Sequence, residues 1–199
     1  MYPLLFVRNK NFYIKSATIA VPIALQSMIT IGVNMMDSIM VGRLGETSLS
    51  AVTLANQFIM LFQICCMGMG MGASVLTARF WGAGNQEDLK RSITIMYRFC
   101  LLFASVFAFA TMLFPIQIMR LYTPDPAICE LGSQYFAWSV ISYWLLGFSL
   151  TTTLVLRSVG QAKLPLLTSI AAFFINVGAN YIFIFGKFGA PQMGVAGAA

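Results

Sequence analysis

Long apolar runs separated by short polar connections make up most of this sequence. A helix that crosses a bilayer needs about 20 mostly apolar residues. The first run is also too long for the core of a signal peptide, which has about 7–15 residues. The pattern predicts an all-α integral membrane protein with five spanning helices and the beginning of a sixth. The predicted segments are 16–41, 49–78, 93–119, 133–156, 164–185 and, for the incomplete sixth, 194–199.

The connections between the runs contain turn-forming residues. The segment 80–92 is rich in glycine and charged residues and predicts a polar loop that leads into the third helix. Pro124, Asp125 and Pro126 predict a break after the third helix.

Lysine and arginine are distributed unevenly over these connections. Cytoplasmic connections of membrane proteins carry an excess of both residues. With a cytoplasmic N-terminus, nine of these residues lie inside and three outside. This bias predicts that the N-terminus is cytoplasmic, and we expect the membrane to be a plasma (inner) membrane. The inside set is Arg8, Lys10, Lys15, Arg79, Lys90, Arg91, Arg98, Arg157 and Lys163, and the outside set is Arg43, Arg120 and Lys187.

Composition favours a protein whose surface contacts the lipid bilayer. Hydrophobic residues make up 59% of the chain and charged residues 9%, whereas about 25% of the residues in a soluble domain are charged. The net charge of +6 is spread between apolar runs rather than clustered, so we expect no nucleic-acid partner.

Catalytic and metal-binding chemistry is not indicated. The chain has no histidine, the commonest general base and metal ligand. Its sequence suggests no nucleophile–base pair, phosphate-binding loop or metal cluster, so we expect no enzyme and no metal site. The cysteines form no CxxC pair and are expected to be inert thiols. They are Cys65, Cys66, Cys100 and Cys129.

A polar stripe runs along the first predicted helix and includes an acidic residue, Asp37. Its members lie within an arc of about 80° at 100° per residue. A carboxylate at the bilayer centre costs about 2.5–3.5 kcal/mol on insertion scales, so such a group usually faces a cavity or a partner. Alternatively, Asp37 snorkels to the water interface near Arg43. The stripe consists of Gln26, Thr30, Asn34 and Asp37.

Two further helices carry polar residues on one face. Ser169, Asn176 and Asn180 fall within about 40° on the fifth, and Asn56 and Gln63 share a face on the second. These side chains line a cavity or simply join helices, since amides also bridge membrane helices for packing. One carboxylate among neutral oxygens suits a small hard cation, and the same carboxylate could carry a proton.

Several segments together resemble the multidrug and toxic compound extrusion (MATE) family. The resemblance covers the chain from about residue 15 to its last residue, with the segments in the family's order and spacing. Besides Asp37, the matching segments are 41–45 (VGRLG), 81–85 (WGAGN), 157–161 (RSVGQ), 176–186 and 194–199 (GVAGAA).

This resemblance implies twelve helices in two six-helix lobes, of which this chain would be the N-terminal one, with a second six-helix lobe as its partner. It implies that Asp37, Asn176 and Asn180 form a cation site and that Pro22, which interrupts the hydrogen bonds of the first helix, is a hinge. Some relatives have a second carboxylate where this chain has Asn180, so the coupling ion is left as Na⁺ or H⁺. No covalently bound cofactor is implied. A sixth-helix threonine of the family would follow Ala199.

The leading functional hypothesis is a cation-coupled antiporter that exports drugs or small organic cations by alternating access. Gln26, Thr30, Asn34, Asn56, Gln63 and Ser169 are then candidates to line its cavity. A lipid-linked oligosaccharide flippase of the same superfamily is an alternative, but the spans contain almost no basic residues to hold a pyrophosphate. A non-transporting truncated remnant is a further alternative, because the sequence stops as the sixth apolar run begins.

Overall fold

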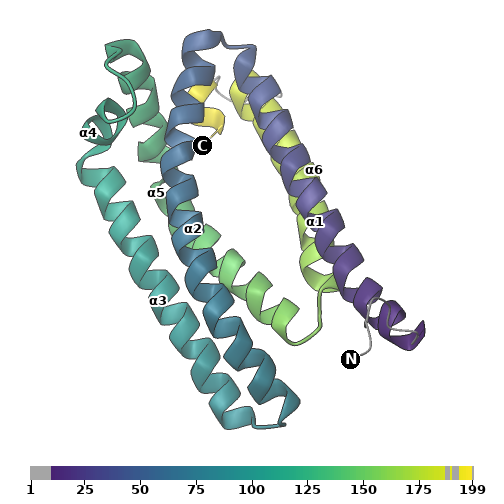
Figure 1. Cartoon of the computed structure of the whole chain (residues 1–199). Coiled ribbons are helices and arrows are strands. Elements are labelled where there is room, and N and C mark those ends of the chain that lie inside the picture. Colours follow the sequence, from purple (N-terminus) through teal and green to yellow (C-terminus); the bar gives the residue numbers. More distant parts are fainter. Residues whose placement is uncertain (1–9, 187–188, 190–192, 199) are drawn as a thin grey trace, which may run out of the picture.

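The computed structural model describes residues 10–186, 189 and 193–198. Arg8, Lys187 and Ala199, which entered the predictions above, lie outside this range, and the side chain of Lys15 is likewise not described. The described residues form α-helices joined by short turns (Figure 1). These helices are α1 (Lys10–Gly42), α2 (Glu46–Gly82), α3 (Gln86–Leu113), α4 (Pro115–Arg120), α5 (Pro126–Ser158) and α6 (Lys163–Phe185), followed by the 3₁₀ helix η1 (Gly194–Ala198).

The prediction of an all-α membrane fold is confirmed. Five of the helices, α1, α2, α3, α5 and α6, are long and apolar enough to cross a membrane. All five begin earlier than predicted, and α1, α2 and α5 also end later. The predicted start of a sixth helix is the 3₁₀ helix η1 over its described residues.

The segment 93–119 was predicted as one helix, and this is wrong at both ends. Helix α3 stops at Leu113 because proline forces the preceding residue out of the helical region. Phe114 accordingly has φ −130° and ψ 42°, and Pro115 starts the separate helix α4. At the other end, the Asn85 side chain accepts a hydrogen bond from the Asp88 backbone N–H at 3.2 Å. This N-cap starts α3 at Gln86, so the predicted loop 80–92 shrinks to the residues between α2 and α3.

The long helices form two groups. Helices α2, α3 and α5 pack as a bundle, while α1 and α6 lie along one another (Figure 1). The bundle core is a cluster of buried residues at which the three helices meet. Its members are Phe62, Cys66, Cys100, Ala104, Ala108 and Tyr143.

The two groups share a second apolar core at one end of the molecule. We call this the α1–α2 end; the opposite end, which contains the α2–α3 and α5–α6 turns, is the α5–α6 end. Residues from both groups and from η1 meet in this core, so it joins the groups firmly at the α1–α2 end. Its members include Met40, Val41, Val52, Ala55, Phe136, Ile184 and Val195.

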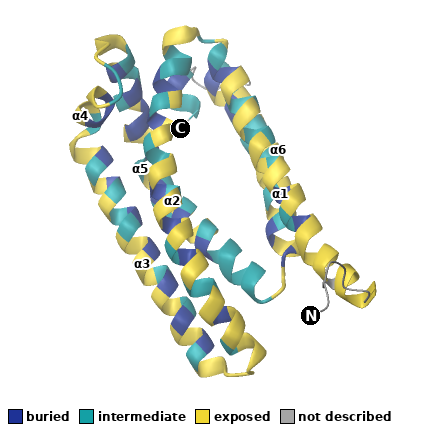
Figure 2. Cartoon of the chain, viewed as in Figure 1, coloured by how far each residue is buried: buried dark blue, intermediate teal, exposed yellow. Residues whose placement is uncertain are grey.

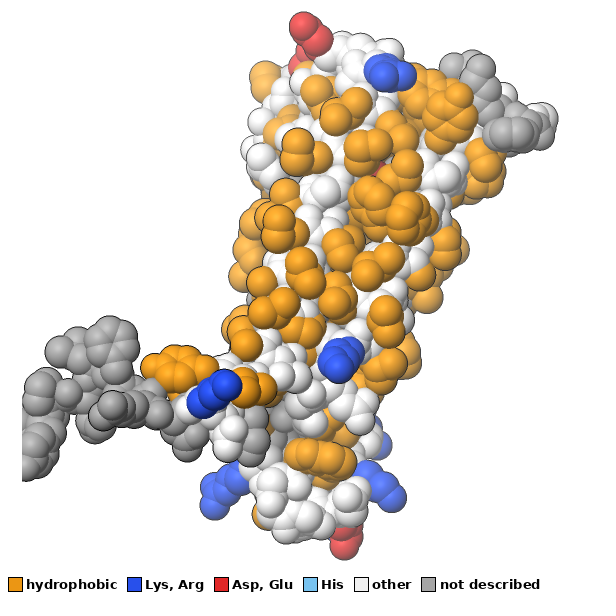
Figure 3. All heavy atoms as spheres, turned by 90° about the vertical axis from the view of Figure 1, so that its right-hand side faces the viewer, with side chains coloured by type: hydrophobic (Ala, Val, Ile, Leu, Met, Phe, Trp, Pro, Cys, Tyr) orange, Lys and Arg blue, Asp and Glu red, His pale blue; other side chains and the backbone are white. Residues whose placement is uncertain are grey.

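Apolar side chains cover much of the outer surface. Buried residues concentrate where α2, α3 and α5 meet and at the α1–α2 end (Figure 2). Large apolar side chains such as Met28, Leu145 and Ile175 remain about two-thirds exposed. On the face shown in Figure 3, hydrophobic side chains cover the middle and charged ones lie mostly toward the two ends. This distribution is that of a multi-pass membrane protein, whose middle contacts lipid or other apolar surfaces.

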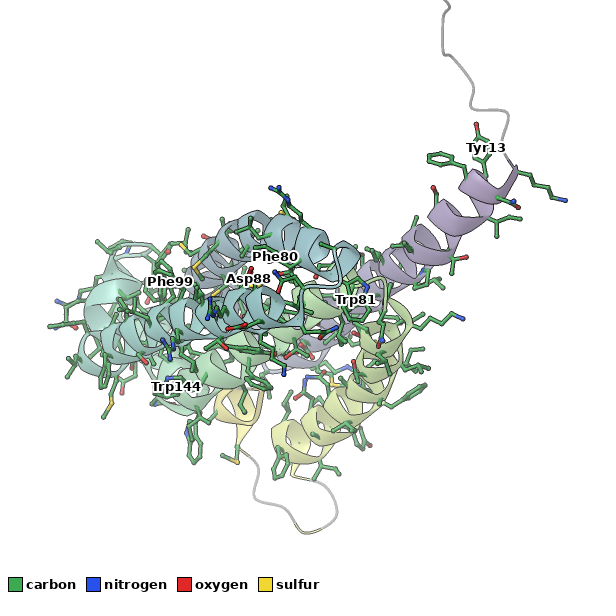
Figure 4. All side chains as sticks on the ribbon, turned by 90° about the horizontal axis from the view of Figure 1, so that it is seen from below. Tyr13, Phe80, Trp81, Asp88, Phe99 and Trp144 are labelled. Atoms are coloured by element: carbon green, nitrogen blue, oxygen red, sulfur yellow. The ribbon has the colours of Figure 1, made fainter. Side chains whose placement is uncertain are left out.

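The two ends of the molecule differ in shape. Viewed from the α5–α6 end, Phe80 of α2 lies near Asp88 of α3 (Figure 4), and the two residues line one pocket. Tyr13 lies on the first part of α1, which projects beyond the other helices. The orientation of these ends relative to the cytoplasm stays a prediction.

Candidate functional site

Asp37 of α1 faces Asn180 of α6. The Asn180 Nδ2 group donates a hydrogen bond to Asp37 Oδ1 at 2.6 Å and a longer one to Asn176 Oδ1 at 3.4 Å. Asn180 is buried and Asp37 is half-buried. The three residues that the resemblance assigned to a cation site are therefore brought together.

A second polar pair holds the same two helices together. Gln26 Nε2 of α1 donates to Ser169 Oγ of α6 at 3.0 Å. The partners in this pair and in the Asp37–Asn180 pair are both 143 residues apart in sequence. The two pairs thus form rungs about three helical turns apart between parallel helices in constant register.

A cavity of about 420 Å³ lies beside Asp37, between α1 and α2. Tyr135 of α5 also lines it, and its hydroxyl donates to Asn56 Oδ1 at 3.1 Å. The polar lining consists of Asn34, Asp37, Ser38, Thr53, Asn56, Gln57, Gln63 and Tyr135.

The chemistry of this lining is that of neutral oxygen donors around one carboxylate. Asp37 is the one charged residue among the lining residues of the described chain. Carboxylate, amide and hydroxyl oxygens are ligands for hard cations, and an apolar wall beside a single negative charge suits an organic cation. Among the described residues, no group of three or more acidic, cysteine or histidine side chains forms a metal cluster.

The family model described as MatE matches residues 22–182, most of the chain. This chain belongs to the MatE family. The resemblance inferred from its sequence motifs is thereby confirmed.

Curated relatives of this MatE chain carry names that refer to drug resistance. It is 29% identical over 181 residues to the probable multidrug resistance protein NorM of Neisseria meningitidis serogroup B, covering 90% of this chain and 39% of the relative. It is 30% identical over 184 residues to the probable NorM of Thermotoga maritima, covering 91% and 39%. The chain thus spans about two fifths of the length of these relatives.

Solved structures share the fold. A MOP superfamily transporter from Pyrococcus furiosus superposes with a TM-score of 0.82 at 22% identity, covering 92% of this chain and 40% of that one. An outward-facing multidrug resistance MATE family transporter gives a TM-score of 0.79 at 23% identity, covering 92% and 40%.

The remaining predicted residues of this MatE chain do not all lie at the cavity. Asn34, Asn56 and Gln63 line the cavity beside Asp37. Gln26 and Ser169 form the other rung, away from the lining of that cavity. Thr30 is exposed, and its hydroxyl donates to the Gln26 backbone carbonyl at 3.0 Å. Pro22 is buried within a continuous α1, and its role as a hinge stays a prediction.

Sequence reasoning missed several residues, among them Tyr135, Gln57 and Arg157. Tyr135 is buried beside the cavity, but a single tyrosine within an apolar run gives no periodic signal. Gln57 directly follows Asn56, so it lies outside the face that Asn56 shares with Gln63 and was not singled out by periodicity. Arg157 was counted as a basic residue of a connection and as part of a family motif, yet its Nη2 donates to Gln26 Oε1 at 2.7 Å. Its position at the end of a span was visible in the sequence, but nothing in the sequence pairs it with Gln26.

Proposed function

We propose that this chain forms the N-terminal lobe of a cation-coupled antiporter that exports drugs or small organic cations by alternating access. The observation that carries the proposal is the Asp37–Asn180 hydrogen bond beside a polar cavity. Membership of the MatE family and the names of the curated relatives support the same reading. The proposed activity is transport rather than chemical conversion of a substrate.

Asp37 is the proposed coupling residue. A carboxylate changes its affinity for Na⁺ or H⁺ when its surroundings change, and transport requires a ligand to bind two conformations unequally. Asn180 and Asn176 hold the carboxylate in place and supply neutral oxygen and N–H groups beside it. The cavity wall formed by α2 then offers amides and Met60 to an organic cation.

A complete transporter requires more than this chain. We infer that a second six-helix lobe packs against its exposed apolar surface, because the curated relatives are more than twice as long. We further infer a plasma (inner) membrane location with the N-terminus in the cytoplasm, for which the uneven distribution of basic residues is the support.

A lipid-linked oligosaccharide flippase fits the cavity less well. Binding a pyrophosphate needs arginine or lysine side chains. The residues that line the described cavity beside Asp37 include a carboxylate and no arginine or lysine. The lining favours a positively charged substrate.

The experiment uses the full-length transporter that contains this chain. Asp37→Asn keeps the shape of the side chain and removes its charge, so it should abolish efflux of a fluorescent organic cation from vesicles energised with a Na⁺ or a pH gradient. Glu130→Gln removes an exposed carboxylate from α5 and serves as the matched control, which should transport normally. Equal efflux by the wild type and a well-expressed Asp37→Asn protein would contradict the proposal.

A further inference from the structure

The two helix groups are joined differently at the two ends of the molecule. At the α1–α2 end, buried apolar residues such as Val41, Phe136 and Ile184 pack together. At the α5–α6 end, α5 and α6 contact each other little, and a hydrogen bond from Arg157 to Gln26 crosses from one group to the other. One junction is therefore apolar and the other is polar.

Arg157 is incompletely paired at this polar junction. It projects from the last turn of α5, and its Nη2 donates to Gln26 Oε1 at 2.7 Å. Its Nε is buried without a hydrogen-bond partner among the described protein atoms. The ion pairs found within the described residues join Arg91 to Glu87 and Asp88, so Arg157 has no described carboxylate beside it.

Gln26 connects Arg157 to the two helices that carry the candidate site. The same amide that accepts from Arg157 donates to Ser169, so the side chains of α5, α1 and α6 are connected in series. The Gln26–Ser169 rung and the Asp37–Asn180 rung tie α1 and α6 into one unit. A movement of this unit at Gln26 is therefore transmitted to the position of Asp37 relative to α2.

We propose that Arg157, Gln26 and Ser169 form a latch that holds the α1–α6 pair against the α2–α3–α5 bundle and opens while the apolar junction stays closed. Arg157 is a positioning residue in this proposal: it acts through Gln26 and does not touch the substrate. The proposal goes beyond the proposed transport function, because the latch sets the width of the cavity in whatever complete protein contains this chain.

The physical reason for opening at this end is the difference between the two junctions. Separating buried apolar side chains exposes their surface and loses close packing. Exchanging a single hydrogen bond for bonds to water has a smaller net cost, even where one partner is charged. The polar junction is thus the easier one to open and close reversibly.

The test measures two distances by double electron–electron resonance in the purified full-length transporter. Spin labels at Val21 of α1 and Val75 of α2 report on the α5–α6 end, and labels at Ile39 of α1 and Glu130 of α5 report on the α1–α2 end. These four residues are exposed. Cys65, which is also exposed, is first replaced by serine to avoid unwanted labelling.

Arg157→Met removes the charge and the donors but keeps an unbranched side chain. It should raise the ratio of open to closed distances at the Val21–Val75 pair about tenfold, the effect of losing one charge-assisted hydrogen bond, and leave the Ile39–Glu130 pair unchanged. Gln26→Glu should shift the first pair the opposite way, because it places a carboxylate opposite Arg157. Arg98→Met, which removes an exposed arginine from α3, is the matched control and should shift neither pair.

Three results would overturn the latch: unchanged distances in Arg157→Met, equal changes at both ends, or shifts of the same sign in Arg157→Met and Gln26→Glu. If Arg157→Met fails to fold, Arg157→Lys keeps the charge and loses the planar fork. It should then give a smaller shift in the opening direction, and no shift would reject the proposal. The distances need no substrate or gradient, so failure of the latch and failure of the proposed transport are separate outcomes.

Discussion

Replacing Gly147 by alanine should destabilise the α2–α3–α5 bundle. A Cβ atom at this position would lie 2.8 Å from Cys100 Sγ and 3.3 Å from Phe62 Cζ. Both neighbours are buried, and Cys100 Sγ already lies 3.7 Å from Cys66 Sγ. The sulfur therefore has little room to retreat, and the three helices must separate slightly or Cys100 must change its rotamer.

The magnitude follows from two opposing effects. Overpacking a well-filled core costs about 1–3 kcal/mol. Alanine in a helix interior recovers up to about 1 kcal/mol relative to glycine. We expect a net loss of about 1–2 kcal/mol, which corresponds to a fall of about 2–8 °C in the melting temperature of a chain of this size.

Thermal stability is measured in detergent by size-exclusion chromatography after heating. Gly72→Ala is the matched control, because a Cβ at Gly72 in α2 would meet no heavy atom within 4 Å. It should leave the melting temperature unchanged or raise it. The double variant Gly147→Ala with Cys100→Ala removes the sulfur from the collision and should lose less stability than the two single changes together. A Gly147→Ala protein as stable as Gly72→Ala would refute this account of the core.

Three further predictions concern individual contacts. Treatment with a thiol oxidant should link Cys66 to Cys100 within one chain, since their sulfurs are 3.7 Å apart. A peptide map after proteolysis should contain the linked fragment, and its absence would contradict the packing of α2 on α3. Asn85→Ala should cost about 1 kcal/mol of stability because α3 loses its N-cap, whereas Asn85→Asp should retain most of it in the same melting assay. Tyr135→Phe removes the hydrogen bond to Asn56 and should weaken binding of an organic cation in a fluorescence titration several-fold, by about 1 kcal/mol, without loss of folded protein; unchanged affinity would place the substrate elsewhere.

Hydropathy alone was enough to predict the five spanning helices, because each must supply its own backbone hydrogen bonds across the apolar layer. It could not reveal the break between α3 and α4. Pro115 lies inside an apolar run, and a hydropathy average does not register the missing backbone donor. The capping pair Asn85 and Asp88 was visible in the sequence, but the polar character of 80–92 favoured a loop over a helix that extends beyond the membrane.

The candidate site was predictable in part. Helical periodicity placed Asp37, Asn176 and Asn180 on polar faces, and these faces do meet. The same periodicity grouped Gln26 with Asp37, although the two belong to different rungs. Which helix lies opposite each polar residue depends on tertiary packing, and a single sequence contains no direct record of it. The contact between Arg157 and Gln26 is an example, because the sequence does not show that the end of α5 lies beside α1.

The constant separation of 143 residues between the partners of the two rungs has a consequence for biosynthesis. A ribosome adds about 5–20 residues per second, so Asp37 and Gln26 emerge roughly 7–30 s before Asn180 and Ser169 exist. During this interval the polar stripe of α1 has no partner on α6, while α2, α3 and α5 are already available to pack with one another. We therefore expect α1 to remain beside the insertion machinery, or in contact with a membrane chaperone, until α6 enters the bilayer and completes the pair.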